Sequence, residues 1–258
     1  MPRKIGFLGT GRIAEPMVRS LLRRFPASRV VVSRRSESIS GKLGGLPGVT
    51  VADNQTVLDH SETVFLCLLA DVARRELPEL RFRSDQQVIS VMADISLAEV
   101  AQLVAPSVDP VVTVPLPFIE SGGCPLPVHP ASASLEELFG DENPVISIGE
   151  ESAMGPHFAA TAILSHTMKQ LDVASHWLAQ FTGSGEDAER YMIALVSGYL
   201  GAMEKDGKGR LREAMEDLST EGGLNNQLRS HIADSGFYDV LVEGLDQLNQ
   251  RFSTPNAE

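Results

Sequence analysis

The sequence predicts an α/β protein, with a parallel sheet in its N-terminal part and only helices in its C-terminal part. Up to about residue 150, short apolar runs alternate with helical or glycine-broken segments, as in parallel sheets whose strands are joined by helices. From Gly155 to Phe252 no convincing strand pattern remains, and apolar residues recur at helical spacing instead. We therefore predict a doubly wound sheet domain over residues 1–150 and an all-helical domain over 151–258.

The predicted strands are short, and the run at residues 63–69 is apolar throughout, which is typical of a strand buried on both faces of a sheet. They lie at residues 5–8, 29–35, 48–53, 63–69, 87–93, 110–118 and 144–149. The first strand is followed by a helix, because Ile13, Met17 and Leu21 recur every four residues. A second helix is predicted over residues 96–104.

In the C-terminal part, apolar residues form helical stripes separated by glycine-rich breaks. The breaks read TGSGED, KDGKG, TEGGLN and DSGF. These stripes are too thin to form an independent core, so we expect the helical part to associate with a second copy of the chain.

Composition and charge exclude several classes of protein. The 258 residues carry a net charge of −12, although residues 1–50 hold ten Lys or Arg against two Glu. A nucleic acid would be repelled by most of this molecule, whereas a small phosphorylated ligand could bind near its N-terminal segment. Cys67 and Cys124 lack zinc-site spacing, so no metal is expected. No signal peptide or membrane span is evident, and we expect a cytoplasmic protein.

The segment GTGRIA (9–14) has the pattern G-x-G-x-x-A between a strand and a helix, which is the context of a dinucleotide-binding turn. Gly9 permits the tight turn, Gly11 leaves room for a pyrophosphate, and Ala14 allows close packing of helix and strand. The helix N-terminus adds amide N–H groups and a partial positive charge. The N-terminal domain is therefore predicted to be a Rossmann-type domain.

The end of the second strand selects between the two nicotinamide cofactors. NAD-binding domains usually have Asp or Glu here, gripping the ribose hydroxyls. In this chain the strand ends with Ser33, Arg34 and Arg35. A hydroxyl and two guanidinium groups suit a 2′-phosphate, so we predict NADP(H) as the cofactor.

Taken together, these motifs resemble those of the pyrroline-5-carboxylate reductase family, in the same order along most of the chain. IGFLGTGRIAEPM resembles the family's glycine-rich turn, SRR its NADP-selecting segment, and VFLCLLADV the strand that borders the nicotinamide. VISVMADISLAEV and VVTVPLPFIESGGCPL resemble the following strands and the proline-rich loop. FTGSGEDAERYMIAL resembles the start of a long C-terminal helix, and LSTEGGLNNQL the start of the Pro-Gly-Gly-Thr-Thr segment.

This resemblance implies an NADPH-dependent reductase of a small cyclic imino acid, most simply 1-pyrroline-5-carboxylate, which gives proline. It also implies a homodimer or larger homo-oligomer built through the helical domain, with no nucleic acid or membrane as a partner. The cofactor contacts would come from Gly9, Thr10, Gly11, Arg12, Ile13, Ser33, Arg34, Arg35, Leu68 and Leu69. The substrate would lie against Pro115, Leu116, Pro117, Glu221, Gly222, Gly223, Leu224 and Asn225.

The sequence departs from the family mainly at the substrate. Leu69 and Ala70 stand in place of Lys-Pro, Pro115–Pro117 reads Pro-Leu-Pro in place of Pro-Asn-Thr-Pro, and Asp94 replaces a glycine. In the later loop Glu221 replaces proline, and Leu224 and Asn225 replace two threonines. A substrate carboxylate would be repelled by Glu221 unless that side chain points away.

Other functions remain open from the sequence. One is an NADP-dependent oxidoreductase of the hydroxyacid or deazaflavin type, for which Lys169 is the one candidate catalytic lysine. Another is a non-catalytic NADP-binding sensor. The catalytic acid is not identified: five histidines lie in or near the second half, and Asn225 fits either a substrate contact or a helix N-cap. These histidines are His129, His157, His166, His176 and His231.

Overall fold

A computed structural model of the chain, which describes residues 2–34 and 37–253, divides into two compact units. The first contains residues 1–158 together with 249–258, and the second contains residues 159–248. The chain thus passes from the first unit to the second after Phe158, and the last turn of the final helix belongs to the first unit. A functional division at residue 150 stays a prediction.

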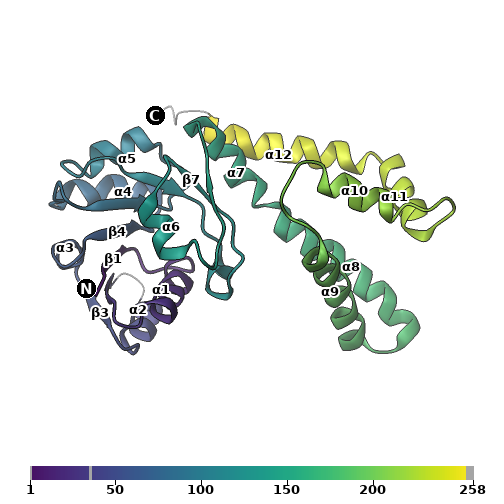
Figure 1. Ribbon diagram of the computed structural model, residues 1–258, viewed down its shortest axis with the longest axis horizontal. Coiled ribbons are helices and arrows are strands. Elements are labelled where there is room, and N and C mark those ends of the chain that lie inside the picture. Colours follow the sequence, from purple (N-terminus) through teal and green to yellow (C-terminus); the bar gives the residue numbers. More distant parts are fainter. Residues whose placement is uncertain (1, 35–36, 254–258) are drawn as a thin grey trace. The chain divides into compact units, whose positions relative to one another are not determined.

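The first unit is built on an eight-stranded sheet in the order β3-β2-β1-β4-β5-β6-β7-β8 (Figure 1). Strands β1 to β6 run parallel, β7 is antiparallel to β6, and β8 is parallel to β7. The order 3-2-1-4-5-6 is that of a Rossmann sheet, so the predicted fold class is confirmed. The strands are β1 Lys4–Leu8, β2 Arg29–Ser33, β3 Val49–Ala52, β4 Thr63–Leu66, β5 Gln87–Ser90, β6 Val111–Thr113, β7 Leu126–His129 and β8 Val145–Ser147.

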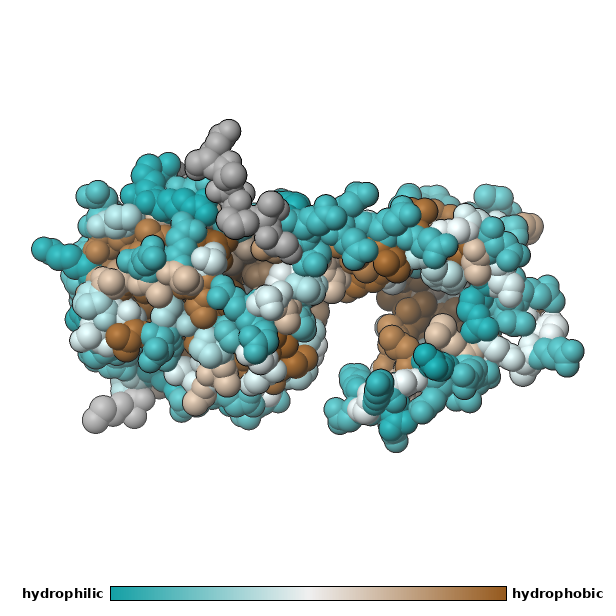
Figure 2. All heavy atoms as spheres, turned by 90° about the horizontal axis from the view of Figure 1, so that it is seen from above, coloured by the Kyte–Doolittle hydropathy of each residue, from teal (hydrophilic) through white to brown (hydrophobic). Residues whose placement is uncertain are grey.

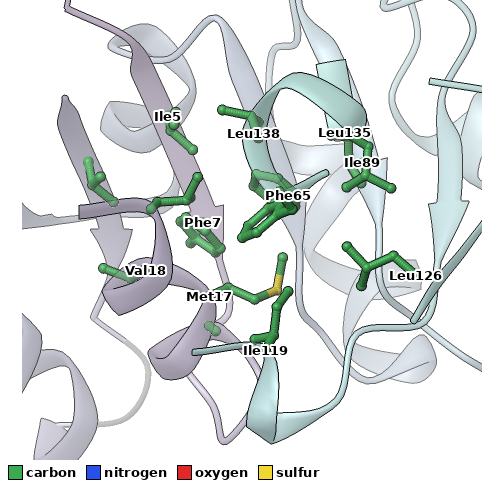
Figure 3. Packing of buried hydrophobic residues seen from close by; sticks show 14 of the residues in the cluster. Ile5, Phe7, Met17, Val18, Phe65, Ile89, Ile119, Leu126, Leu135 and Leu138 are labelled. Atoms are coloured by element: carbon green, nitrogen blue, oxygen red, sulfur yellow. The ribbon is translucent and has the colours of Figure 1, made fainter. Parts of the chain in front are cut away.

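Helices cover both faces of this sheet because its side chains alternate between two cores. Phe7, Phe65 and Ile89 point into one core (Figure 3), where the rings of Phe7 and Phe65 stack at 4.9 Å. That core also packs against α1 Ala14–Arg24, α2 Glu37–Gly44 and α6 Ala133–Phe139. The opposite core holds Leu8, Val64 and Val88 against α3 Asn54–Asp59, α4 Ala70–Glu76 and α5 Leu97–Leu103.

Strand β4 ends three residues earlier than its apolar run predicts. Pairing stops at Leu66, and Leu69, whose side chain is 76% exposed, precedes the first residue of α4. The amide of Cys67 still donates to the carbonyl of Leu8 at 2.7 Å. The last residues of the apolar run, Leu68 and Leu69, therefore lie outside the strand and beside the glycine turn.

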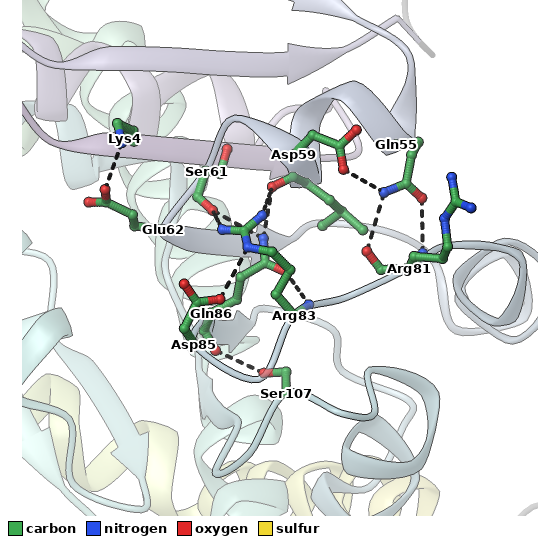
Figure 4. Close-up of polar contacts among 11 residues, drawn as sticks. Lys4, Gln55, Asp59, Ser61, Glu62, Arg81, Arg83, Asp85, Gln86 and Ser107 are labelled. Carbon is green, nitrogen blue, oxygen red and sulfur yellow. Dashed lines mark hydrogen bonds and ion pairs between the residues drawn. The ribbon is translucent and has the colours of Figure 1, made fainter.

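A polar network holds the loops that precede β4 and β5 (Figure 4). The buried Gln86 donates from Nε2 to the carbonyls of Leu58 and Ser61, at 2.8 and 3.0 Å. Its Oε1 accepts from the backbone N–H of Arg83 at 2.8 Å. Because each of these polar atoms is paired, a buried glutamine is tolerated here.

The second unit consists of helices only, as predicted. They are α8 Ile163–Thr182, α9 Gly185–Ala202, α10 Arg210–Asp217, α11 Leu224–Asp234 and most of α12 Phe237–Ser253, while the short α7 Met154–Ala160 leads into the unit. Helix α8 ends at Gly183 in the left-handed conformation, and the Ser184 hydroxyl caps α9 by accepting from the N–H of Asp187. Among the described residues, no helix is long and apolar enough to cross a bilayer.

This helical unit has almost no interior of its own. Within residues 159–248, all of which the structure describes, only Ala159, Ser175 and Ala188 are buried. Large apolar side chains lie at its surface instead (Figure 2), among them Trp177, Phe181, Tyr191, Leu195, Leu211, Leu224, Leu228 and Val240.

Candidate functional site

The predicted phosphate-binding turn lies at the carboxyl end of β1. Gly9 has φ +92°, and a Cβ added there would lie 2.4 Å from the carbonyl oxygen of Cys67, so only glycine fits this turn. A Cβ at Gly11 would meet no atom within 4 Å. The backbone of Gly11 therefore faces open space, which is what a pyrophosphate would occupy above the N-terminus of α1. Ala14 is fully buried, as the motif predicts.

Two neighbouring pockets open at this end of the sheet, and Leu68 lines both. One, of about 380 Å³, is lined by Thr10, Gly11, Arg12, Ile39, Cys67, Leu68 and Leu69. The other, of about 400 Å³, is lined by Ser33, Arg34, Asp53, Asn54, Leu68, Arg75 and Glu76. Each volume falls in the range of small-molecule sites, and together they can hold an extended ligand that crosses the glycine turn.

Ser33 has a structural contact that the sequence did not predict. Its side chain is almost fully buried, and its Oγ accepts a hydrogen bond from the N–H of Gly9 at 2.9 Å. The hydroxyl of Thr10 in turn donates to the carbonyl of Ser33 at 3.1 Å. These two bonds fix the end of β2 against the glycine turn. A direct contact between Ser33 and a phosphate stays a prediction.

The other predicted cofactor residues are distributed as follows. Arg34 is exposed and lines the second pocket, while Arg35 lies outside the described residues. Ile13 packs against the core of the first unit, and neither it nor Gly9 lines either pocket. The remaining predicted residues all line one pocket or both.

The pockets also contain residues that the sequence analysis missed. Asp53 and Asn54 directly follow β3, and Cys67 follows β4, so their positions after predicted strands were a usable signal. Arg75 and Glu76 lie on α4, where no motif marks them. They reach the pocket only because of how α4 packs on the sheet.

The carboxylate of Asp53 is already used within the protein. It accepts from the backbone N–H of Thr56 at 2.9 Å and from the Thr56 hydroxyl at 2.8 Å, which caps α3. These hydrogen bonds stabilise the charged form and lower the pKa of Asp53. Asp53 therefore differs from the ribose-gripping carboxylate of NAD-binding domains, which ends the second strand and not the third.

Cys67 is unsuited to nucleophilic chemistry although it lines a pocket. Burial raises the pKa of its thiol, so the sulfur stays protonated and weakly reactive at neutral pH. Its surroundings make it a small apolar part of the pocket wall.

The two predicted substrate segments lie in different units, so their combination in one site stays a prediction. Pro115 is buried after β6, Pro117 is exposed, and the N–H of Leu116 donates to the Cys124 sulfur at 3.4 Å. This segment belongs to the first unit, and residues 221–225 belong to the second.

The loop at residues 220–223 is a tight turn that leads into α11. The N–H of Gly223 donates to the carbonyl of Thr220 at 2.9 Å, and Gly222 has φ +71°, as in a type II turn. The Gly223 amide is thus already used. Helix α11 begins at Leu224, with Gly223 at its N-cap, so the interpretation of Asn225 as the N-cap is wrong. The amides of Leu224 and Asn225 lie in the first turn of a helix, where N–H groups have no intrahelical partner.

Of the alternative catalytic residues, three are exposed, namely Lys169, His176 and His231, and three are half-buried, namely His129, His157 and His166. Lys169 is 71% exposed and pairs with Asp172 at 2.7 Å, and His176 also contacts Asp172. His166 differs, because its Nε2 is buried without a hydrogen-bond partner among the described residues. It lines an apolar hollow of about 250 Å³ within the helical unit, beside Phe237.

Comparison with known proteins supports the two parts of the chain to different extents. Residues 4–94 match the family described as "NADP oxidoreductase coenzyme F420-dependent". This match covers roughly a third of the chain, namely the segment that contains the glycine turn and both pockets. The search against curated proteins gives no significant match.

Solved structures resemble the whole chain in fold. A Plasmodium falciparum pyrroline carboxylate reductase with bound NADP has a TM-score of 0.81 at 12% identity, covering 96% of each chain. A Coxiella burnetii pyrroline-5-carboxylate reductase has a TM-score of 0.81 at 16% identity, covering 98% of each. An Aspergillus terreus reductive aminase in complex with NADPH reaches 0.59 at 16% identity, over 97% of this chain and 92% of the other.

The chain therefore has the fold of pyrroline-5-carboxylate reductases along nearly its full length, as the motif resemblance predicted. The prediction of NADP(H) is confirmed at the level of the family that residues 4–94 match and of the cofactors bound by these neighbours. At such low identities the neighbours establish the fold and not the substrate.

Proposed function

We propose that this protein is an NADPH-dependent reductase of a small cyclic imine or imino acid, most simply 1-pyrroline-5-carboxylate, which gives proline. The observation that carries the proposal is the glycine turn itself. Its Gly11 backbone faces open space and lines one of two neighbouring pockets, each in the size range of a small-molecule site. The fold shared with imino acid reductases supports the choice of substrate class.

The cofactor half of the proposal rests on residues of the first unit alone. The amides at the start of α1 would hold the pyrophosphate. Arg34 would bind the 2′-phosphate, with Arg35 next to it in the sequence, in the pocket that also contains Asn54. The bound cofactor would supply the hydride for the C=N carbon.

Beyond the hydride transfer, the reaction requires no acid or base from the protein. An iminium nitrogen is already protonated, so addition of hydride to its carbon gives the neutral amine without a further acid. The protein has to position the substrate and keep water out. Leu68 and Leu69 offer an apolar wall for this purpose. The N–H groups that open α11 offer donors for a substrate carboxylate, with Glu221 exposed beside them.

The cofactor assignment is tested by the double substitution Arg34→Ala with Arg35→Ala. We expect the KM for NADPH to rise far more than the KM for NADH, because only NADPH carries the 2′-phosphate. Steady-state oxidation of each cofactor with 1-pyrroline-5-carboxylate measures this. Equal effects on both cofactors would contradict NADP selectivity.

The substrate loop is tested by restoring the family's residues with Glu221→Pro, Leu224→Thr and Asn225→Thr together. If the loop holds the substrate carboxylate, the triple variant gains two hydroxyl donors and loses a repelling charge. We expect kcat/KM for 1-pyrroline-5-carboxylate to rise about tenfold. Asn226→Thr, one residue further along the helix, is the matched control. No activity of either protein on cyclic imines, with NADPH binding retained, would favour a sensor.

A second candidate is hydride exchange between NADP and coenzyme F420, which the match of residues 4–94 favours. Oxidation of NADPH by an F420-type deazaflavin, in the absence of any imine, would support it. The hydroxyacid alternative loses support, because Lys169 is exposed and paired with Asp172.

We further propose that the helical unit associates with a second copy of the chain. The support is the large apolar surface of helices α8 to α12, which monomeric proteins rarely leave in water. A compact monomer in sedimentation at micromolar concentration would contradict this.

A further inference from the structure

Two arginines follow each other on α4, and they have different surroundings. Arg74 binds both oxygens of Glu99 on α5, at 2.7 and 3.2 Å, and pairs with Asp71 at 3.1 Å. Its guanidinium therefore joins α4 to α5. Arg75 lines the pocket that contains Ser33 and Arg34.

The guanidinium of Arg75 is oriented by Glu76 but keeps hydrogen-bond donors without a partner in the described part of the chain. Its Nε and Nη2 donate to one oxygen of Glu76, at 3.2 and 3.1 Å. Among the described residues, its Nη1 has no hydrogen-bond partner, and the side chain is 68% exposed. A guanidinium held on one side and open on the other can donate to a ligand without losing its existing contact.

The pocket is lined by two guanidinium groups and two carboxylates, so its charges balance, and unpaired hydrogen-bond donors are the groups that distinguish an anionic ligand from a neutral one. Of the two carboxylates that line it, Asp53 is bound to Thr56 and Glu76 is bound to Arg75. Arg34, by contrast, has no ion pair among the described residues. An anion entering here would meet the guanidinium of Arg34, which follows β2, and the Nη1 of Arg75 on α4, unpaired within the described residues, while both carboxylates already accept hydrogen bonds.

We propose that Arg75 is a specificity-determining residue for NADP, whose guanidinium binds the adenosine 2′-phosphate together with Arg34 of the SRR segment. This inference rests on the proposed NADP site and adds a contact from α4 that the SRR motif does not contain. The competing role for Arg75 is stacking of its guanidinium on the adenine ring. That role would not distinguish a 2′-phosphate from a 2′-hydroxyl, so the two are separable by experiment.

The test measures binding of adenosine 2′,5′-bisphosphate and of 5′-AMP to the full chain by calorimetry, which requires no enzymatic activity. The variants are Arg75→Ala and Arg75→Gln, with the exposed Arg81→Ala as the matched control, since Arg81 is not among the residues that line this pocket. We expect both Arg75 variants to weaken the bisphosphate about tenfold and to change 5′-AMP less than twofold, because one charge-assisted hydrogen bond is lost. Arg81→Ala should leave both unchanged.

Three outcomes would overturn the inference. Equal weakening of both ligands would indicate stacking on adenine, and no change in either would show that Arg75 does not reach the ligand. If the unsubstituted protein binds neither ligand, the proposed cofactor fails together with this inference. If the unsubstituted protein binds the bisphosphate selectively and one of the first two outcomes follows, only the role of Arg75 fails.

Discussion

The first and second units bury their apolar residues to very different extents. In the first, Phe7, Phe65 and Phe139 are fully or almost fully buried, and their rings contact one another. In the second, Trp177 and Phe181 contact each other at 5.1 Å but are 60% and 71% exposed. The first unit thus has the interior of a complete domain, whereas the second leaves its large apolar side chains at its surface.

This difference predicts which binding step each unit can perform without a second chain. The glycine turn, Arg34 and both pockets lie entirely in the unit that has its own core. The predicted substrate loop lies in the unit that lacks one. We therefore expect cofactor binding to be robust and substrate binding to depend on association between chains.

The largest effect is expected from Phe65→Ala, because its ring stacks on that of Phe7 (Figure 3) and meets the ring of Phe139 edge-on in the core. Loss of a buried phenyl group should lower the free energy of unfolding by about 3–5 kcal/mol. Chemical denaturation monitored by circular dichroism measures this. Phe118→Ala, at a partly exposed ring of the same unit, should cost much less. Similar losses for both would contradict the described core.

The substitution Trp177→Asp tests the other half of the comparison. A carboxylate in an apolar interface would be desolvated without a partner, so we expect the dimer to weaken about a hundredfold. Sedimentation velocity over a range of concentrations measures the change. Gln180→Asp adds the same charge at an exposed polar position of α8 and should have little effect. Unchanged association of the Trp177 variant would show that this face is not an interface.

Gly9→Ala is expected to lower the stability of the fold, whereas Gly11→Ala is expected to weaken NADPH binding. Alanine at Gly9 would collide with the Cys67 carbonyl and strain a positive φ, which should cost about 1–3 kcal/mol of stability. Alanine at Gly11 meets open space, so stability should stay within about 0.5 kcal/mol, while NADPH binding weakens. Thermal melting and fluorescence titration of NADPH separate the two. Normal NADPH binding by Gly11→Ala would contradict the predicted path of the pyrophosphate.

The smallest effect is expected from Asp53→Asn. Its folded pKa is below the unfolded value, so its charge contributes stability at neutral pH that is lost as the pH falls through the folded pKa. Asparagine removes this pH-dependent part. The gap in melting temperature between the unsubstituted protein and the variant should therefore shrink from pH 7 toward about pH 3. Glu79→Gln is the control, and a gap that is independent of pH would contradict the charged cap.

Some features of the site were predictable because they depend on local constraints. The GTGRIA turn can be identified from its spacing alone, since the positive φ and close contact at Gly9 require glycine and the approach of a pyrophosphate to the backbone explains the second glycine. The position of Arg34 in the second pocket was also predictable locally, because the SRR segment ends a predicted strand. Strand β7 was missed because its pairing partners, β6 and β8, determine it as a strand, and its own sequence contains Pro127.

By itself, the sequence determined the alternation of strands and helices, the position of the phosphate-binding turn and the change to an all-helical C-terminal part. These follow from side-chain periodicity and glycine geometry within a few residues. Only the tertiary structure decided that Ser33 supports the glycine turn and that Arg75 lines the same pocket as Arg34. Those relations join residues more than twenty positions apart or depend on which way a helix face turns, and packing fixes both.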